Sequence, residues 1–182
     1  MVALHLGQTA PDRIQRIVVI APGPPGGIGV DEATAAYLRQ VALGDAAVQA
    51  EGLAAMWGDR LSDRWRLHKA AKWREAADPR AAADYVDMFA LRGLPDTSRT
   101  VAMPVLAITG ERDAEIMRSG AVRGALATLC PHLEVIPLQD VGHYPMQEAP
   151  PLTYTLVERF LAPATSASPD TKPAIDHGSE GS

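Results

Sequence analysis

Residues 103–113 read MPVLAITGERD, an apolar run followed by a short polar turn. Residues 103–109 are almost entirely apolar, which is typical of a strand that is buried on both faces of a parallel sheet. The turn that follows ends in the carboxylate of Asp113. Because ligands of open α/β sheets bind at the carboxyl ends of the strands, we expect Asp113 to lie at a functional edge.

The segments on either side of this strand alternate between strand and helix patterns. Further strands are predicted over residues 14–21, which contain the run RIVVIA, and over residues 133–138, LEVIPL. Helices are predicted over residues 1–10, 116–129 and 152–161. This alternation predicts an α/β fold with about three parallel strands and flanking helices.

A long helical stretch separates the first predicted strand from the second. It follows a loop, GPPGGIG at residues 23–29, and runs from Asp31 to about Arg92 with abundant Ala, Leu, Arg and Glu. We expect four short helices in it, with breaks at Gly44, Gly52, Gly58 and Asp78-Pro79. We interpret this stretch as a helical cap that is inserted into the α/β fold.

These patterns divide the chain into four regions. Residues 1–22 hold a helix and a strand, 23–100 the helical cap, 101–162 a C-terminal core and 163–182 a tail. The tail is rich in Pro, Ser, Thr, Asp and Gly, so we expect it to be disordered. The first helix has no capping residue before it, and the strand RIVVIA would leave an unpaired edge, so a preceding segment is expected.

The composition argues against several classes of function. A net charge of −5 disfavours broad nucleic-acid binding, which needs an excess of Lys and Arg. No apolar run is long enough to span a bilayer, and the N-terminus lacks the pattern of a signal peptide. The single cysteine, Cys130, excludes an intrachain disulfide. We therefore expect a cytoplasmic protein with a small-molecule substrate and with no membrane or nucleic-acid partner.

A histidine loop follows the third predicted strand, where residues 140–148 read DVGHYPMQE. His143 lies one strand-helix-strand step after Asp113 (143 − 113 = 30 residues), so both side chains can emerge at one edge of the sheet. An aspartate bonded to a histidine ring nitrogen fixes the tautomer and stabilises the imidazolium during proton transfer. Asp140 and Glu115 stay open as alternative acids.

These residues resemble the α/β-hydrolase family, in which a strand ending in a GxxD turn supplies the acid and a GH loop supplies the base. The resemblance covers nearly all of residues 1–162, and residues 1–22 look like the helix and strand that follow the family's G-x-S-x-G nucleophile elbow. It implies that the chain is the C-terminal part of such a fold, with His143 and Asp113 as catalytic residues. The nucleophile would fall about four residues before Met1.

No residue of the chain is expected to replace that nucleophile. Ser62, Ser98 and Ser119 lack the glycine spacing of an elbow. Cys130 precedes Pro131 at the end of a predicted helix, away from the helix N-terminus that lowers a thiol pKa.

Cofactor and metal signatures are also missing from the sequence. The loop GPPGGIG lacks the GxGxxG spacing of a dinucleotide site, and its prolines remove amide donors that would bind phosphate. The five histidines show no paired ligand spacing. We expect neither a cofactor nor a metal.

In the family that the chain resembles, the cap lines an apolar substrate pocket. The candidate lining residues here are the large apolar side chains of the predicted cap: Met56, Trp57, Trp65, Tyr85, Met88 and Phe89. Side chains of this kind at helical spacing also serve as ordinary core residues.

Three functional hypotheses follow from the sequence. The first is a hydrolase of carboxylic esters or related bonds, in which His143 and Asp113 serve a nucleophile that is missing from the chain. The second is a truncated, non-catalytic member that acts as an interaction module, forms a homo-oligomer or is the obligate partner of another chain that covers the open strand edge. The third is a misplaced start, with Met1 as an internal methionine of a longer protein.

Overall fold

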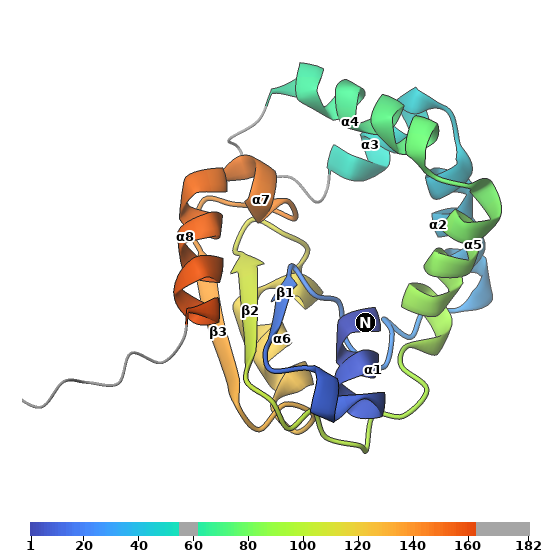
Figure 1. The fold of residues 1–182 in the computed structure, drawn as a ribbon. Coiled ribbons are helices and arrows are strands. Elements are labelled where there is room, and N and C mark those ends of the chain that lie inside the picture. Colours follow the sequence, from blue (N-terminus) through green and yellow to red (C-terminus); the bar gives the residue numbers. More distant parts are fainter. Residues whose placement is uncertain (55–61, 163–182) are drawn as a thin grey trace, which may run out of the picture.

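The structure is a computed structural model, and it describes residues 1–54 and 62–162 (Figure 1). Three parallel strands form one sheet in the order β1-β2-β3, with β1 at Ile17–Ile20, β2 at Val105–Gly110 and β3 at Leu133–Leu138. Every residue of β2 is buried, as a central strand between two parallel neighbours requires. The predicted α/β class with three parallel strands is confirmed.

Helices cover both faces of this sheet. On one face α1 (Val2–Thr9) and α6 (Ser119–Leu126) pack over the strands, and their buried leucines Leu4 and Leu126 join one apolar core. On the other face α8 (Pro150–Leu161) contributes half-buried Leu156, Val157 and Phe160 to a second core. The sheet therefore lies in the middle of three layers (Figure 1).

The chain between β1 and β2 forms a helical insertion. Its elements are α2 (Glu32–Leu43), α3 (Ala46–Ala54), α4 (Asp63–Ala76), α5 (Pro79–Asp87) and η2 (Met88–Arg92), which continues α5. α2 packs against α5 and α3 against α4, so that the insertion arches over the end of the sheet (Figure 1). Asp31 and Asp78 cap the N-termini of α2 and α5 by accepting backbone N–H groups.

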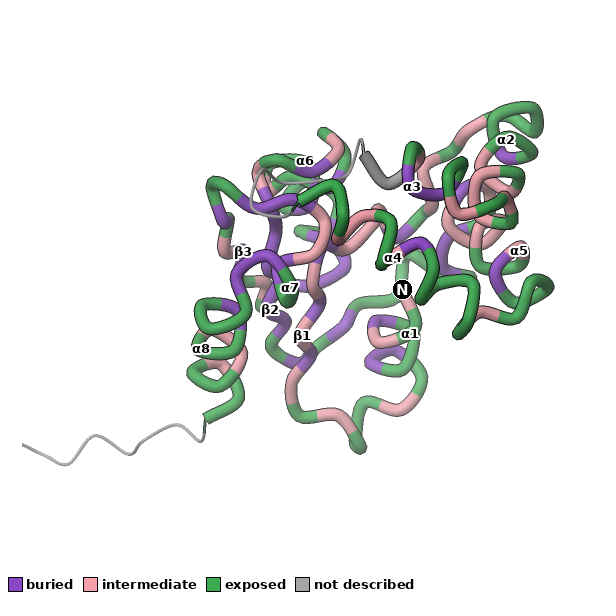
Figure 2. The backbone as a smooth tube through the Cα atoms, turned by 90° about the horizontal axis from the view of Figure 1, so that it is seen from above, coloured by how far each residue is buried: buried purple, intermediate pink, exposed green. Residues whose placement is uncertain are grey.

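Burial differs between the sheet and the helical insertion. Buried positions are concentrated in the strands, whereas the insertion has only isolated ones (Figure 2). Among the described residues from α2 to η2, the buried apolar side chains are all alanines: Ala35, Ala50, Ala70, Ala82 and Ala90. The insertion therefore holds together through close helix contacts rather than through a core of large side chains.

Several boundaries differ from the sequence prediction. β1 has only four residues, because its partner β2 begins at Val105, after Pro104, which has no N–H to donate. The predicted helix over residues 116–129 is divided into η3 (Glu115–Met117) and α6. The proposed break at Gly52 is wrong: this residue lies within α3, where a Cβ would overlap the side chain of Val41 on α2. Glycine there permits close helix packing.

Other predicted boundaries are confirmed. Gly44 ends α2, and Asp78-Pro79 begins α5. The third predicted strand matches β3, and α8 begins two residues before the predicted helix. Two short elements were not predicted, η1 (Pro11–Arg13) and α7 (Pro145–Glu148). Gly58 and the tail over 163–182 lie outside the described residues.

No helix in the two described ranges is long and apolar enough to cross a bilayer.

Candidate active site

The loop after β2 and the loop after β3 meet backbone to backbone. Gly110 ends β2, and a Cβ at this position would overlap the main-chain oxygens of Val141 and Gly142. The N–H of Arg112 donates to the Val141 oxygen at 2.9 Å. Only glycine fits this approach, and it brings the loop that carries Asp113 next to the loop that carries His143.

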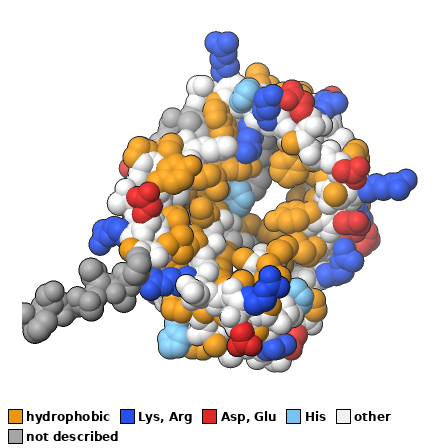
Figure 3. Space-filling model, in the orientation of Figure 1, with side chains coloured by type: hydrophobic (Ala, Val, Ile, Leu, Met, Phe, Trp, Pro, Cys, Tyr) orange, Lys and Arg blue, Asp and Glu red, His pale blue; other side chains and the backbone are white. Residues whose placement is uncertain are grey.

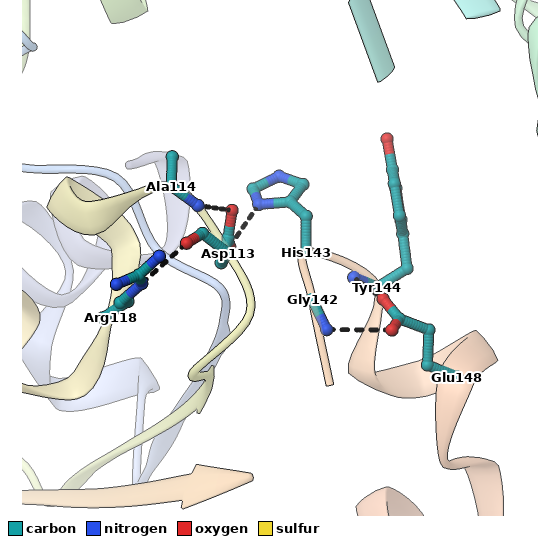
Figure 4. A network of polar contacts seen from close by, with 7 residues as sticks. All are labelled: Asp113, Ala114, Arg118, Gly142, His143, Tyr144 and Glu148. Atoms are coloured by element: carbon teal, nitrogen blue, oxygen red, sulfur yellow. Dashed lines mark hydrogen bonds and ion pairs between the residues drawn. The ribbon is translucent and has the colours of Figure 1, made fainter. Parts of the chain in front are cut away.

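The carboxylate of Asp113 faces the ring of His143 at this junction (Figure 4). Asp113 Oδ2 lies 2.8 Å from His143 Nδ1, and Oδ1 accepts the N–H of Ala114 at 2.7 Å. The Asp113 side chain is fully buried, while that of His143 is 24% exposed. Arg118 Nε donates to the main-chain oxygen of Asp113 at 2.8 Å, which attaches the turn to the residue that precedes α6.

This geometry sets the protonation pattern that the pair can use. A carboxylate accepts hydrogen bonds only, so Nδ1 of His143 is the donor and Nε2 is left as the basic nitrogen. Nε2 points away from Asp113 and out of the loop (Figure 4). A neutral histidine in this tautomer can take a proton at Nε2, and the buried carboxylate then stabilises the imidazolium.

The rival acids named from the sequence are not bonded to His143. Asp140 and Glu115 are both exposed, and no hydrogen bond among the described residues joins either to the ring. The geometry therefore pairs His143 with Asp113.

Glu148 also binds the histidine loop, and the sequence did not predict this contact. It ends α7 and is buried, with Oε2 accepting the N–H of Gly142 at 2.8 Å and Oε1 accepting the N–H of Tyr144 at 3.0 Å. Its partners are backbone groups, which leave no residue pattern in a sequence. The only signal available was a carboxylate five residues after a histidine.

Tyr144 connects the histidine loop to the helical insertion. Its ring meets the His143 ring edge-on with centroids 5.3 Å apart and the Trp65 ring of α4 at 5.8 Å. The ammonium of Lys69, also on α4, lies 4.6 Å from the Tyr144 ring centroid. Burial, and then the charges of Asp113 and Glu148, raise the pKa of Tyr144 to about 12, while burial lowers the pKa of Lys69.

The candidate lining residues are distributed over the insertion. Trp65 lies against Tyr144, next to His143. Met88 lines a groove of about 660 Å³ between η2 and the start of α1, Phe89 packs over Gly23, and Tyr85 is exposed on α5. Met56 and Trp57 lie outside the described residues. Hydrophobic side chains surround the hollow between the sheet and the insertion (Figure 3).

The residues considered as nucleophiles lie in structural positions. Ser98 donates to Asp96, Ser62 precedes α4, and Ser119 begins α6. Cys130 is buried, and burial raises the pKa of its thiol to about 11. Within residues 1–54 and 62–162, no serine hydroxyl or thiol is hydrogen-bonded to His143.

The described residues contain no group of three or more His, Cys, Asp or Glu side chains that could hold a metal ion.

No family model and no curated protein matches the chain. Solved structures do match. A bromoperoxidase from Bacillus anthracis shares 20% sequence identity and a TM-score of 0.70, covering 88% of this chain and 62% of that one. An N-acyl homoserine lactone degrading enzyme shares 22% identity and a TM-score of 0.66, with 88% and 63% covered.

An alpha/beta hydrolase enzyme from a deep-sea metagenome library shares 16% identity and a TM-score of 0.62, with 93% of this chain and 64% of that one covered. At these identities the likeness shows the fold, and the chain has the fold of the C-terminal part of an α/β-hydrolase, as predicted. It spans 60–64% of the length of the first solved structures that it matches.

Proposed function

We propose that the chain supplies the acid and the base of a hydrolase that acts on carboxylic esters or related bonds. The observation that carries this proposal is the 2.8 Å hydrogen bond between buried Asp113 and His143 at the carboxyl ends of neighbouring parallel strands. The likeness to the lactone-degrading enzyme supports the bond type, because a lactone is a cyclic ester. A small-molecule substrate and a cytoplasmic location belong to the same proposal.

In this function His143 is the general base. With a serine or cysteine nucleophile, Nε2 takes the proton as the nucleophile attacks the ester carbonyl carbon, and the resulting imidazolium returns it to the leaving alcohol. Water then repeats the sequence on the acyl-enzyme, with Nε2 taking its proton. With an aspartate nucleophile, His143 instead activates the water that cleaves the covalent intermediate.

The nucleophile of this proposal comes from outside the described residues. Nε2 of His143 is the basic nitrogen, and it has no serine or cysteine partner among residues 1–54 and 62–162. A strand beside β1 that ends in a nucleophile would reach the same edge of the sheet as Asp113 and His143, because parallel strands align their carboxyl ends.

The experiment compares two polypeptides on an activated ester, 4-nitrophenyl acetate. One is the 182-residue chain, and the other joins it to the segment that its gene encodes immediately upstream. We expect hydrolysis by the longer polypeptide only, and its loss in a His143→Ala variant. If the longer polypeptide shows no hydrolysis, or if His143→Ala leaves the rate unchanged, the proposal is wrong.

A second candidate function rests on the outer edge of β1. Within the described residues β1 pairs only with β2, so the opposite edge presents unpaired backbone groups beside half-buried Val18 and Ile20. An edge of this kind pairs with a strand of another chain. The alternative is therefore a non-catalytic partner or a homo-oligomer, and sedimentation of the 182-residue chain as a stable monomer would count against it.

A further inference from the structure

Glu148 is a buried carboxylate whose two oxygens hold the main chain on both sides of His143. The residue is 6% exposed and lies at the end of α7. Oε2 accepts the N–H of Gly142 at 2.8 Å, and Oε1 accepts the N–H of Tyr144 at 3.0 Å (Figure 4). One side chain thus binds the residue before the histidine and the residue after it.

The helix α7, which carries Glu148, is held in place by contacts that do not involve His143. α7 begins at Pro145, whose ring restricts φ. The hydroxyl of Thr153 on α8 lies 2.8 Å from the Pro145 oxygen and 3.0 Å from the Ala149 oxygen, and its single proton is shared between these two acceptors. Residues on both sides of Glu148 are thus attached to α8. α8 in turn packs on the sheet through Leu156, Val157 and Phe160. The carboxylate therefore has a defined position relative to Asp113.

The histidine loop needs such a support. Gly142 has no Cβ and populates more backbone conformations than other residues. The His143 side chain is 24% exposed, so packing alone leaves its ring only partly constrained. A small displacement of the ring would lengthen the 2.8 Å bond to Asp113, and hydrogen bonds weaken steeply with poor geometry.

The hydrogen-bond partners of the Glu148 carboxylate agree with a role in supporting the histidine loop. Among the described residues, no Lys, Arg or His forms an ion pair with it. A buried carboxylate is retained where its oxygens accept hydrogen bonds, and here both acceptors serve backbone N–H groups of one loop.

We propose that Glu148 is a positioning residue that holds the ring of His143 in hydrogen-bonding register with Asp113. It acts through the backbone of the loop and touches no reacting atom. The inference deepens the site of the proposed function, and it rests on that function only for its catalytic consequence. Its primary test observes the Asp113–His143 bond itself, so a failure of the hydrolase proposal is distinguishable from a failure of this one.

The test is proton NMR of the 182-residue chain and its variants. The Nδ1 proton of His143, held between a ring nitrogen and a buried carboxylate, gives a resonance at low field that is absent in His143→Ala. Glu148→Gln keeps one acceptor oxygen but sets an amide N–H against a backbone N–H, so we expect a weaker and faster-exchanging resonance. Glu148→Ala removes both acceptors and is expected to abolish it.

Glu158→Gln, the same chemical change at an exposed position of α8, is the matched control and should keep the wild-type resonance. Should Glu148→Ala fail to fold, Glu148→Gln decides the matter, with folding checked by circular dichroism. In the longer polypeptide the same substitution should lower kcat and leave KM unchanged. A wild-type resonance in folded Glu148→Gln and Glu148→Ala, or no low-field resonance in the wild type, would overturn the proposal.

Discussion

Gly110 and Gly142 lie in direct backbone contact, and this contact joins the end of β2 to the loop of His143. Any side chain at Gly110 would overlap the main-chain oxygens of Val141 and Gly142. The two loops that carry Asp113 and His143 can therefore approach each other only while position 110 is glycine. The 2.8 Å bond between these two side chains depends on that approach.

A Gly110→Ala substitution should thus separate the loops. The obstacle is rigid backbone rather than the end of a flexible side chain, so we expect a loss of about 1–3 kcal/mol in the free energy of unfolding. The low-field proton of His143 should disappear as well. Urea unfolding and proton NMR measure the two effects.

Gly124→Ala is the control for that substitution. Gly124 lies within α6, and a Cβ there meets open space. Because glycine disfavours a helix interior, the control should be more stable than the wild type by about 0.5–1 kcal/mol. If the two substitutions changed the free energy of unfolding equally, Gly110 would not be required for the close approach of the two loops.

Tyr144 should make the stability of the fold depend on alkaline pH. Its pKa is raised from 10.0 to about 12, so the folded state keeps the phenol proton while the unfolded state loses it. The raised pKa of Tyr144 therefore contributes fully to the free energy of unfolding below pH 10, and this contribution is lost as the pH rises towards 12. At pH 11 the wild type should have lost about 1 kcal/mol that a Tyr144→Phe variant keeps.

Urea unfolding of both proteins at pH 8 and pH 11 measures this difference. The comparison cancels the titration of groups that the two proteins share. A stability gap between wild type and Tyr144→Phe that is the same at both pH values would show that Tyr144 does not carry the effect.

Cys130 should react slowly with thiol reagents in the folded chain. The residue is 1% exposed, and burial raises the pKa of its thiol to about 11, so only about one thiol in a thousand is ionised at pH 8. Labelling with an aromatic disulfide should be slow in buffer and fast in urea. A native rate close to the unfolded rate would mean that the thiol is accessible and activated.

The sequence predicted the parts of this fold that depend on local pattern. The apolar runs around Val105 and Val135 identified two strands, and the alternation with helices identified the parallel sheet. The approach of Asp113 and His143 was predictable too, because residues that follow neighbouring parallel strands meet at one edge.

What the sequence could not reveal depends on backbone groups or on contacts between distant segments. Glu148 binds two backbone N–H groups, which any residue type offers. The contact of Trp65 with Tyr144 joins positions 79 residues apart (144 − 65 = 79), and no periodicity encodes it. The sequence predicted a helix break at Gly52. Only the packed structure shows the side chain of Val41 of α2 beside this glycine.

The most direct test of the central claim is a double-mutant cycle on Asp113 and His143 in the polypeptide that includes the upstream segment. Residues that act as one unit give non-additive losses. We expect Asp113→Asn and His143→Ala each to lower kcat on 4-nitrophenyl acetate by about 10³- to 10⁴-fold, and the double variant to be no slower than His143→Ala. Losses that multiply, or an Asp113→Asn variant with wild-type kcat, would contradict a working acid–base pair.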